Sequence, residues 1–188
     1  VKGGDPYVFG RGGEEVIALE KEKLKFEVIP GITSPIAVLN YAGIPLTHRG
    51  IAQSFHIVTG MTGTNEKINW KALAQEKGTL VFMMGLENIE RIVANLIDNK
   101  KHVKTPAAVV MRGTSSKQRK VIGNLENIIQ KVREANLKSP CIIVIGDVVN
   151  LNKELSWYEE KPLFGTNICI TRSREQSSEL KSSLRDLG

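Results

Sequence analysis

Short apolar segments alternate along this chain with stretches in which apolar residues recur every three or four positions. The apolar segments have the length and composition of buried β-strands. They cover residues 26–29, 54–59, 79–84, 106–111, 141–146 and 167–171. Strands that alternate with helices are typical of an α/β architecture, so we predict an α/β fold.

Helices are predicted where the apolar residues take up helical spacing. The clearest case is residues 87–99, in which Ile89, Ile92 and Leu96 fall on a single face. The other predicted helices cover residues 14–22, 34–42, 69–76 and 125–135. A mixed-charge stretch that ends in proline and glycine, residues 151–165, indicates a linker. Beyond it, one strand and one helix cannot bury their own faces, so we expect 166–188 to begin another domain.

Composition and charge narrow the function further. The chain has 188 residues, of which 41% are hydrophobic and 24% charged, a globular balance that disfavours disorder. No apolar run approaches the roughly 18 residues of a membrane helix, so we expect a cytoplasmic protein with no membrane partner. Lysine and arginine exceed aspartate and glutamate by 26 − 20 = 6, and the pI is about 9.3. A basic excess favours anionic partners such as nucleic acid or a polycarboxylate.

The cysteines and histidines give no sign of a metal site. Cys141 and Cys169 both lie in apolar runs, and a free cysteine behaves as a small hydrophobic residue. We therefore expect two buried thiols and no disulfide. The histidines are scattered without the spacing of metal ligands, so no metal is predicted.

A glycine-rich opening is the densest candidate for ligand chemistry. Gly3 and Gly4 allow a ligand to approach the backbone closely, and Asp5 presents a carboxylate beside them. The same Gly-Gly-Asp-Pro sequence is also typical of an ordinary reverse turn. The segment lacks the G-K-[ST] of a P-loop and is not a G-x-G-x-x-G fingerprint that opens a helix.

Three further segments fall at helix starts or strand ends. Thr33 and Ser34 stand at a predicted helix start, where free N–H groups attract polar ligands. Met84 follows a buried strand and suits an adenine slot. Gly113 lies in a basic loop after another strand. Taken one at a time, these features are better explained by capping, core packing and a solvated loop. Their shared position indicates a ligand site at one edge of the sheet.

The ordered motifs resemble a known family. "GGDPYVFGRGGEE", "FEVIPGITSPIAVLNYAGIPLTHRG" and "TLVFMMGLENI" are together similar to the S-adenosylmethionine-dependent tetrapyrrole methylases, in particular the uroporphyrinogen-III C-methyltransferases. The resemblance spans about residues 1–160. It implies that 1–43 is the last part of a first domain and 44–150 a complete second domain. The segment "KPLFGTNICITRSREQSSEL" resembles the start of uroporphyrinogen-III synthase, which implies a fused bifunctional enzyme.

The resemblance also implies site residues and a reaction. The cofactor contacts of the family fall on Gly3, Gly4, Asp5, Val8, Thr33, Ser34, Met84 and Gly113. Arg11 is assigned to substrate carboxylates, with which a guanidinium pairs well. The implied reaction transfers two methyl groups from S-adenosylmethionine to uroporphyrinogen III. It yields precorrin-2 and S-adenosylhomocysteine on the branch to sirohaem and cobalamin, and a homodimer is expected.

No catalytic residue is assigned within these residues. The acidic and lysine residues that serve as acid and base in the family are expected upstream of Val1, so we expect this chain alone to be inactive. Alternatives are a methylase of the same fold acting on a later cobalamin intermediate or on RNA, and a non-catalytic binding fragment. Aromatic residues make up only 5% of the chain, which offers few platforms for base stacking and disfavours nucleic acid.

Overall fold

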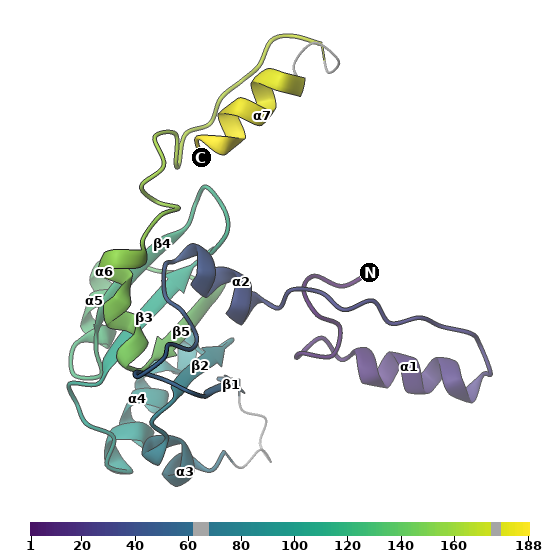
Figure 1. Ribbon diagram of the computed structural model, residues 1–188. Helices are drawn as coiled ribbons and strands as arrows, with labels where there is room; N and C mark the ends of the chain where they lie inside the picture. The colour runs from purple at the N-terminus through teal and green to yellow at the C-terminus, as the bar shows by residue number, and fades with distance from the viewer. Residues whose placement is uncertain (62–67, 174–177) are drawn as a thin grey trace.

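A mixed β-sheet forms the centre of the protein, whose computed structural model describes residues 1–61, 68–173 and 178–188. The strands are β1 (Phe55–Thr59), β2 (Thr79–Met83), β3 (Pro106–Met111), β4 (Arg119–Asn124) and β5 (Cys141–Ile145). They lie in the order β1-β2-β5-β3-β4 (Figure 1). β1 and β2 are parallel, whereas β5 runs antiparallel to β2 and β3, and β4 antiparallel to β3. The α/β prediction is confirmed.

Helices cover both faces of this sheet. The described residues form the helices α1 (Gly12–Lys21), α2 (Ser34–Tyr41), α3 (Trp70–Gln75), α4 (Ile89–Asp98), α5 (Ile128–Glu134), α6 (Asn152–Leu155) and α7 (Ser178–Asp186), with short 3₁₀ turns η1 (Leu86–Asn88) and η2 (Asp147–Leu151). Successive strand residues face opposite sides. Leu80 and Phe82 pack with α3, α4 and α5, and Val81 packs with α2 and η2. Figure 1 shows α1 and α7 projecting away from the sheet in different directions.

The strongest sequence patterns are confirmed. The predicted strands at 54–59, 79–84, 106–111 and 141–146 correspond to β1, β2, β3 and β5 within one residue at each end. The helical stripe on α4 is buried, with Ile92 and Leu96 fully inaccessible to solvent. These elements were predictable because burial on a shared core imposes a clear period on their sequences.

Two predicted strands do not form and one strand was missed. Residues 26–29 and 167–171 are apolar but have no ladder partner in the described part of the chain, and Phe26 and Ile29 are exposed. The missed strand is β4, an edge strand with partly exposed side chains. Its pattern is weak because it carries Arg119 and Lys120, and charged residues commonly blunt sheet edges.

The expectation for the cysteines is only half correct. Cys141 is buried in β5, whereas Cys169 is exposed, since the strand predicted around it does not form. Residues 151–165, expected to be a linker, include α6 and a segment whose Trp157 and Tyr158 rings contact Tyr41 of α2. No helix in the described residues is long and apolar enough to cross a membrane.

Candidate functional site

One edge of the sheet gathers the ends of three strands, β1, β2 and β3, and the starts of the other two, β4 and β5. Met83, at the end of β2, lies beside Thr59 of β1 and opposite Ile142 of β5. Met111, at the end of β3, lies opposite Cys141. A cavity of about 710 Å³ opens at this edge, with Met83, Cys141 and Ile142 among its lining residues. Such a volume suits a small organic ligand.

The segments singled out in the sequence come together around this cavity. The lining includes Gly3, Gly4, Val8, Thr33, Ser34, Met84 and Gly113. Residues from the N-terminal arm, from the start of α2 and from two strand-end loops therefore share one space. Their sequence separation exceeds 100 residues between Gly3 and Gly113, so only the fold brings them together.

Asp5 does not line the cavity but forms hydrogen bonds to two segments that do, the glycine-rich loop and the segment before α2. One carboxylate oxygen accepts a hydrogen bond from the backbone N–H of Tyr7 at 2.9 Å. The other accepts from the N–H of Gly31 at 3.2 Å. These bonds, first that from Tyr7 and then that from Gly31, lower the pKa of Asp5 because they stabilise the ionised form. Asp5 is therefore a carboxylate at neutral pH and connects the glycine-rich loop to the segment before α2.

The glycine-rich loop and the segment before α2 approach each other so closely that only glycine fits at position 31. A Cβ added at Gly31 would lie 2.3 Å from the carbonyl oxygen of Gly4. Gly4 itself has φ +79°, a conformation that other L-residues adopt at a cost. The backbones of the Gly4 and Thr33 walls are thus packed directly on each other.

Four of the eight non-glycine residues with a positive φ in the described part of the chain line the cavity. Phe9, Met84, Arg112 and Thr114 line it, and each has a positive φ, between 47° and 68°. For residues other than glycine this left-handed conformation costs about 1–2 kcal/mol. Residues held in such a conformation are found most often at functional sites. Between the last two, Gly113 packs against α2, where an added Cβ would lie 2.4 Å from a methyl carbon of Val38.

Arg11 lies outside the cavity lining, just before α1. Its guanidinium forms an ion pair with Glu14, with Nη2 at 2.6 Å from Oε2. This hydrogen bond and the charge of Glu14 raise the pKa of Arg11. Both side chains are largely exposed, so an incoming carboxylate can compete with Glu14 at little cost.

Several lining residues were not predicted. Among the described lining residues Arg112 carries the only positive charge and Glu87 the only negative one. Asn88 donates from Nδ2 to the carbonyl oxygen of Gly60 at 2.9 Å, which joins the loops after β1 and β2. The start of β5 also contributes, through Cys141. The antiparallel direction of β5 places its first residue here, and sequence periodicity does not report strand direction.

We predict that Cys141 reacts slowly with thiol reagents at neutral pH although it lines the cavity. Burial raises its pKa to about 11, because desolvation disfavours the thiolate that reacts. At pH 7 roughly one such thiol in ten thousand is ionised. Alkylation with iodoacetamide, followed by mass spectrometry, should label the exposed Cys169 first. Labelling of Cys141 should rise about tenfold per pH unit between pH 7 and 10. Equal rates for the two cysteines at pH 7 would contradict this prediction.

Comparisons with known proteins agree on one family. The family model described as Tetrapyrrole (Corrin/Porphyrin) Methylases matches residues 1–129. The porphyrin biosynthesis protein HemD of Ruminiclostridium josui is 44% identical over 190 residues, which cover 100% of this chain and 38% of the relative. A uroporphyrinogen-III C-methyltransferase of Bacillus subtilis is 46% identical over 192 residues, 100% of this chain and 39% of that protein. This chain thus spans less than half the length of these curated relatives.

A solved structure is similar in fold as well as in sequence. The uroporphyrin-III C-methyltransferase of Thermus thermophilus, in complex with S-adenosylhomocysteine, superposes with a TM-score of 0.69 at 35% identity. The match covers 80% of this chain and 65% of that one.

Proposed function

Because this chain belongs to the tetrapyrrole (corrin/porphyrin) methylase family, we propose that it forms the cofactor-binding part of a uroporphyrinogen-III C-methyltransferase. The reaction would transfer methyl groups from S-adenosylmethionine to ring carbons of uroporphyrinogen III, giving precorrin-2 for sirohaem and cobalamin. The observation that carries the proposal is the cavity at the sheet edge, which collects seven of the eight cofactor residues expected from the sequence.

The chemistry of the cavity suits an adenosyl cofactor. Apolar side chains such as Val8, Ile32 and Met84 line one part of it, and such surfaces accept the flat faces of an adenine. Gly3 and Gly4 leave backbone accessible at the cavity, and Gly113 lets its loop pack closely against Val38 of α2. The cofactor brings a methyl group already activated by its sulfonium charge. The work left to these residues is to hold donor and acceptor in line and to exclude water.

Charge supports an anionic tetrapyrrole as the acceptor. The net charge of the chain is +6, and Arg11 is exposed next to the glycine-rich loop, where its ion-pair partner is the exposed Glu14. We propose that Arg11 binds substrate carboxylates in place of Glu14, because a guanidinium forms paired hydrogen bonds with a carboxylate. A nucleic-acid acceptor remains the alternative outcome of the test below.

The proposal extends to the whole enzyme. The relatives are much longer than this chain, which supports the proposal that residues 1–43 complete a first domain encoded upstream and that residues 166–188 begin a synthase domain. The general acid and base would then lie in the upstream part. The family resemblance further supports a cytoplasmic homodimer, whose mass light scattering would measure.

We expect methyl transfer to require the upstream part. The 188-residue chain and a version extended upstream by one domain are incubated with S-adenosylmethionine and uroporphyrinogen III. S-adenosylhomocysteine should form only with the extended version and only when uroporphyrinogen III is present. Binding of the cofactor without turnover on uroporphyrinogen III would sink the substrate assignment, and ribosomal RNA would be the next acceptor to try. Failure of the folded, extended protein to bind the cofactor would contradict the proposed function itself.

A further inference from the structure

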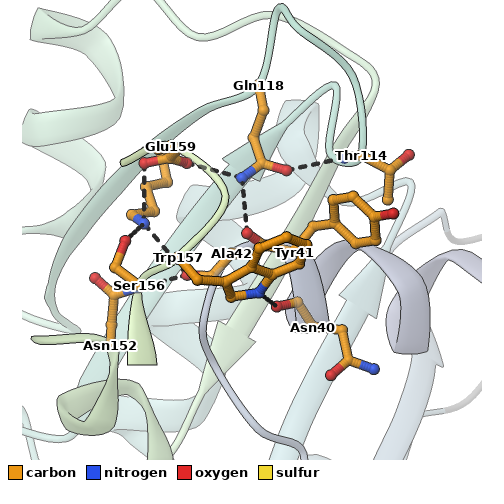
Figure 2. Close-up of polar contacts among 10 residues, drawn as sticks. Asn40, Tyr41, Ala42, Thr114, Gln118, Asn152, Ser156, Trp157 and Glu159 are labelled. Carbon is orange, nitrogen blue, oxygen red and sulfur yellow. Dashed lines mark hydrogen bonds and ion pairs between the residues drawn. The ribbon is translucent and has the colours of Figure 1, made fainter. Parts of the chain in front are cut away.

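A single buried amide joins three distant segments behind the cavity. Gln118 is 2% exposed. Its Oε1 accepts from the backbone N–H of Thr114 at 2.8 Å. Its Nε2 donates to the carbonyl oxygen of Tyr41 at 3.2 Å and to Oε1 of Glu159 at 2.8 Å. Figure 2 shows this arrangement, which we call the Gln118 cross-link and define by Tyr41, Thr114, Gln118 and Glu159.

Glu159 is itself held firmly. Its other carboxylate oxygen pairs with Nζ of Lys120 at 2.9 Å, and the two side chains are only 22% and 12% exposed. Lys120 also donates to the carbonyl oxygen of Ala42 at 3.2 Å and to the hydroxyl of Ser156 at 3.1 Å. Each charge therefore has several partners, which a shielded ion pair requires to be stable.

Aromatic packing fixes the same segment to α2. Nε1 of Trp157 donates to the carbonyl oxygen of Asn40 at 3.1 Å. The ring of Tyr41 lies 5.1 Å from that of Trp157 and 4.7 Å from that of Tyr158, between ring centroids. The hydroxyl of Tyr158 reaches the carbonyl oxygen of Thr114 at 3.5 Å. Residues 156–159 thus cover the C-terminal end of α2 and the loop before β4 together.

Two of the segments that the Gln118 cross-link joins, α2 and the loop between β3 and β4, also form walls of the cavity. Thr114 and its neighbour Gly113 line it directly, and α2 contributes Ser34 at its other end. Gly113 and Val38 are in contact midway along α2. Gln118 and Glu159 are absent from the lining. A change at the Gln118 cross-link therefore reaches a ligand only by moving these walls.

We propose that Gln118 is a positioning residue for cofactor binding, and that residues 156–159 belong functionally to the methylase unit because they complete its cross-link. The inference rests on the proposed function. Gln118 holds Thr114 in its left-handed conformation and sets the distance between the Gly113 wall and the α2 wall. Loss of the amide lets the 112–118 loop move. The cavity then has its ligand-binding shape in only a fraction of the molecules.

The test compares Gln118→Met with wild type in the full chain, using S-adenosylhomocysteine as the probe. Methionine keeps the length of the side chain but removes the amide, so we expect the Kd to rise about tenfold, or about 1.4 kcal/mol. Amide hydrogen exchange is measured without ligand on the same samples. Exchange at residues 112–118 should accelerate in the variant, with β5 unchanged. If Gln118→Met does not fold, Glu159→Gln replaces it, with a smaller expected rise in the Kd.

Asn127→Ala is the matched control. Asn127 is partly buried, and like that of Gln118 its side-chain oxygen accepts from a backbone N–H, that of Asn124 at 3.0 Å, but it does not line the cavity. Its loss should lower the melting temperature without changing the Kd. A merely structural role for Gln118 predicts the same result for Gln118→Met. An unchanged Kd for Gln118→Met would therefore overturn the proposal, whether or not exchange at 112–118 accelerates.

A swap of the two partners gives a second readout. Gln118→Glu places a carboxylate against Glu159 and should weaken binding more than Gln118→Met does. Adding Glu159→Gln again sets one amide against one carboxylate, now with the carboxylate at position 118 and the amide at position 159. The double variant should therefore bind S-adenosylhomocysteine more tightly than Gln118→Glu alone. Additive effects would contradict a direct contact between the two. Absence of S-adenosylhomocysteine binding both in wild type and in the version extended upstream would instead sink the proposed function, while the exchange data would still decide whether Gln118 holds the loop.

Discussion

Replacing Gly31 with alanine is expected to weaken the binding of S-adenosylhomocysteine roughly tenfold to hundredfold while the sheet stays folded. The added Cβ would lie 2.3 Å from the carbonyl oxygen of Gly4, a backbone atom that no rotamer change can move away. Overpacking of this kind costs about 1–3 kcal/mol. The two segments relieve it by separating, which breaks the hydrogen bond from Gly31 to Asp5. Gly4 and Thr33 then no longer face the cavity together.

Gly13→Ala is the control for this change. An added Cβ at Gly13 meets nothing within 4 Å, and the residue lies in α1. Alanine is the better helix former by about 1 kcal/mol, so this variant should bind the ligand as wild type does. Isothermal titration measures both dissociation constants, and circular dichroism checks the fold. An unaffected Kd for Gly31→Ala would show that the close approach of the two segments has no role in binding.

Replacing Phe82 with alanine is expected to lower the free energy of unfolding by about 3–5 kcal/mol. Phe82 lies on β2, is fully buried, and stacks on Trp70 of α3 with ring centroids 6.0 Å apart. Its removal leaves a cavity between the sheet and the helices, and the surrounding side chains collapse into it only in part. The melting temperature should fall by roughly 6–20 °C.

Phe55→Ala provides the matched comparison on the neighbouring strand. Phe55 begins β1 and is 41% exposed, so its truncation should cost less than about 1 kcal/mol. Urea denaturation of both variants measures the difference. Equal losses of stability would mean that the face of the sheet toward α3, α4 and α5 is not the main core.

The sequence predicts those elements whose side chains meet a core. Val81, Phe82 and Ile143 sit in uniformly apolar runs because both faces of the central strands are covered. β4 escaped prediction since an edge strand can keep charged residues. Residues 26–29 are apolar but unpaired, and an apolar run alone does not supply the neighbour on which a strand depends.

The site was predictable to a similar extent. Thr33, Met84 and Gly113 stand next to expected strand ends or helix starts and Gly3 lies in the glycine-rich opening, and the family resemblance selected them from many such residues. The role of Asp5 as a brace between two segments depends on a contact 26 residues away in sequence. Gln118 bonds to Tyr41 and Glu159, 77 and 41 residues away. Neither contact leaves a local pattern in the sequence.

The position of β5 has a consequence for the order in which the protein can assemble. It is the last strand in sequence but lies in the middle of the sheet, with every residue buried. During synthesis from the N-terminus, β1 can pair with β2 and β3 with β4, yet no strand connects the two pairs in the sheet until residue 145 has emerged. Until then the inner edges of β2 and β3 expose unpaired backbone N–H and C=O groups among apolar side chains, a template for association between nascent chains. Completion of the ligand cavity and burial of these edges are therefore the same late event.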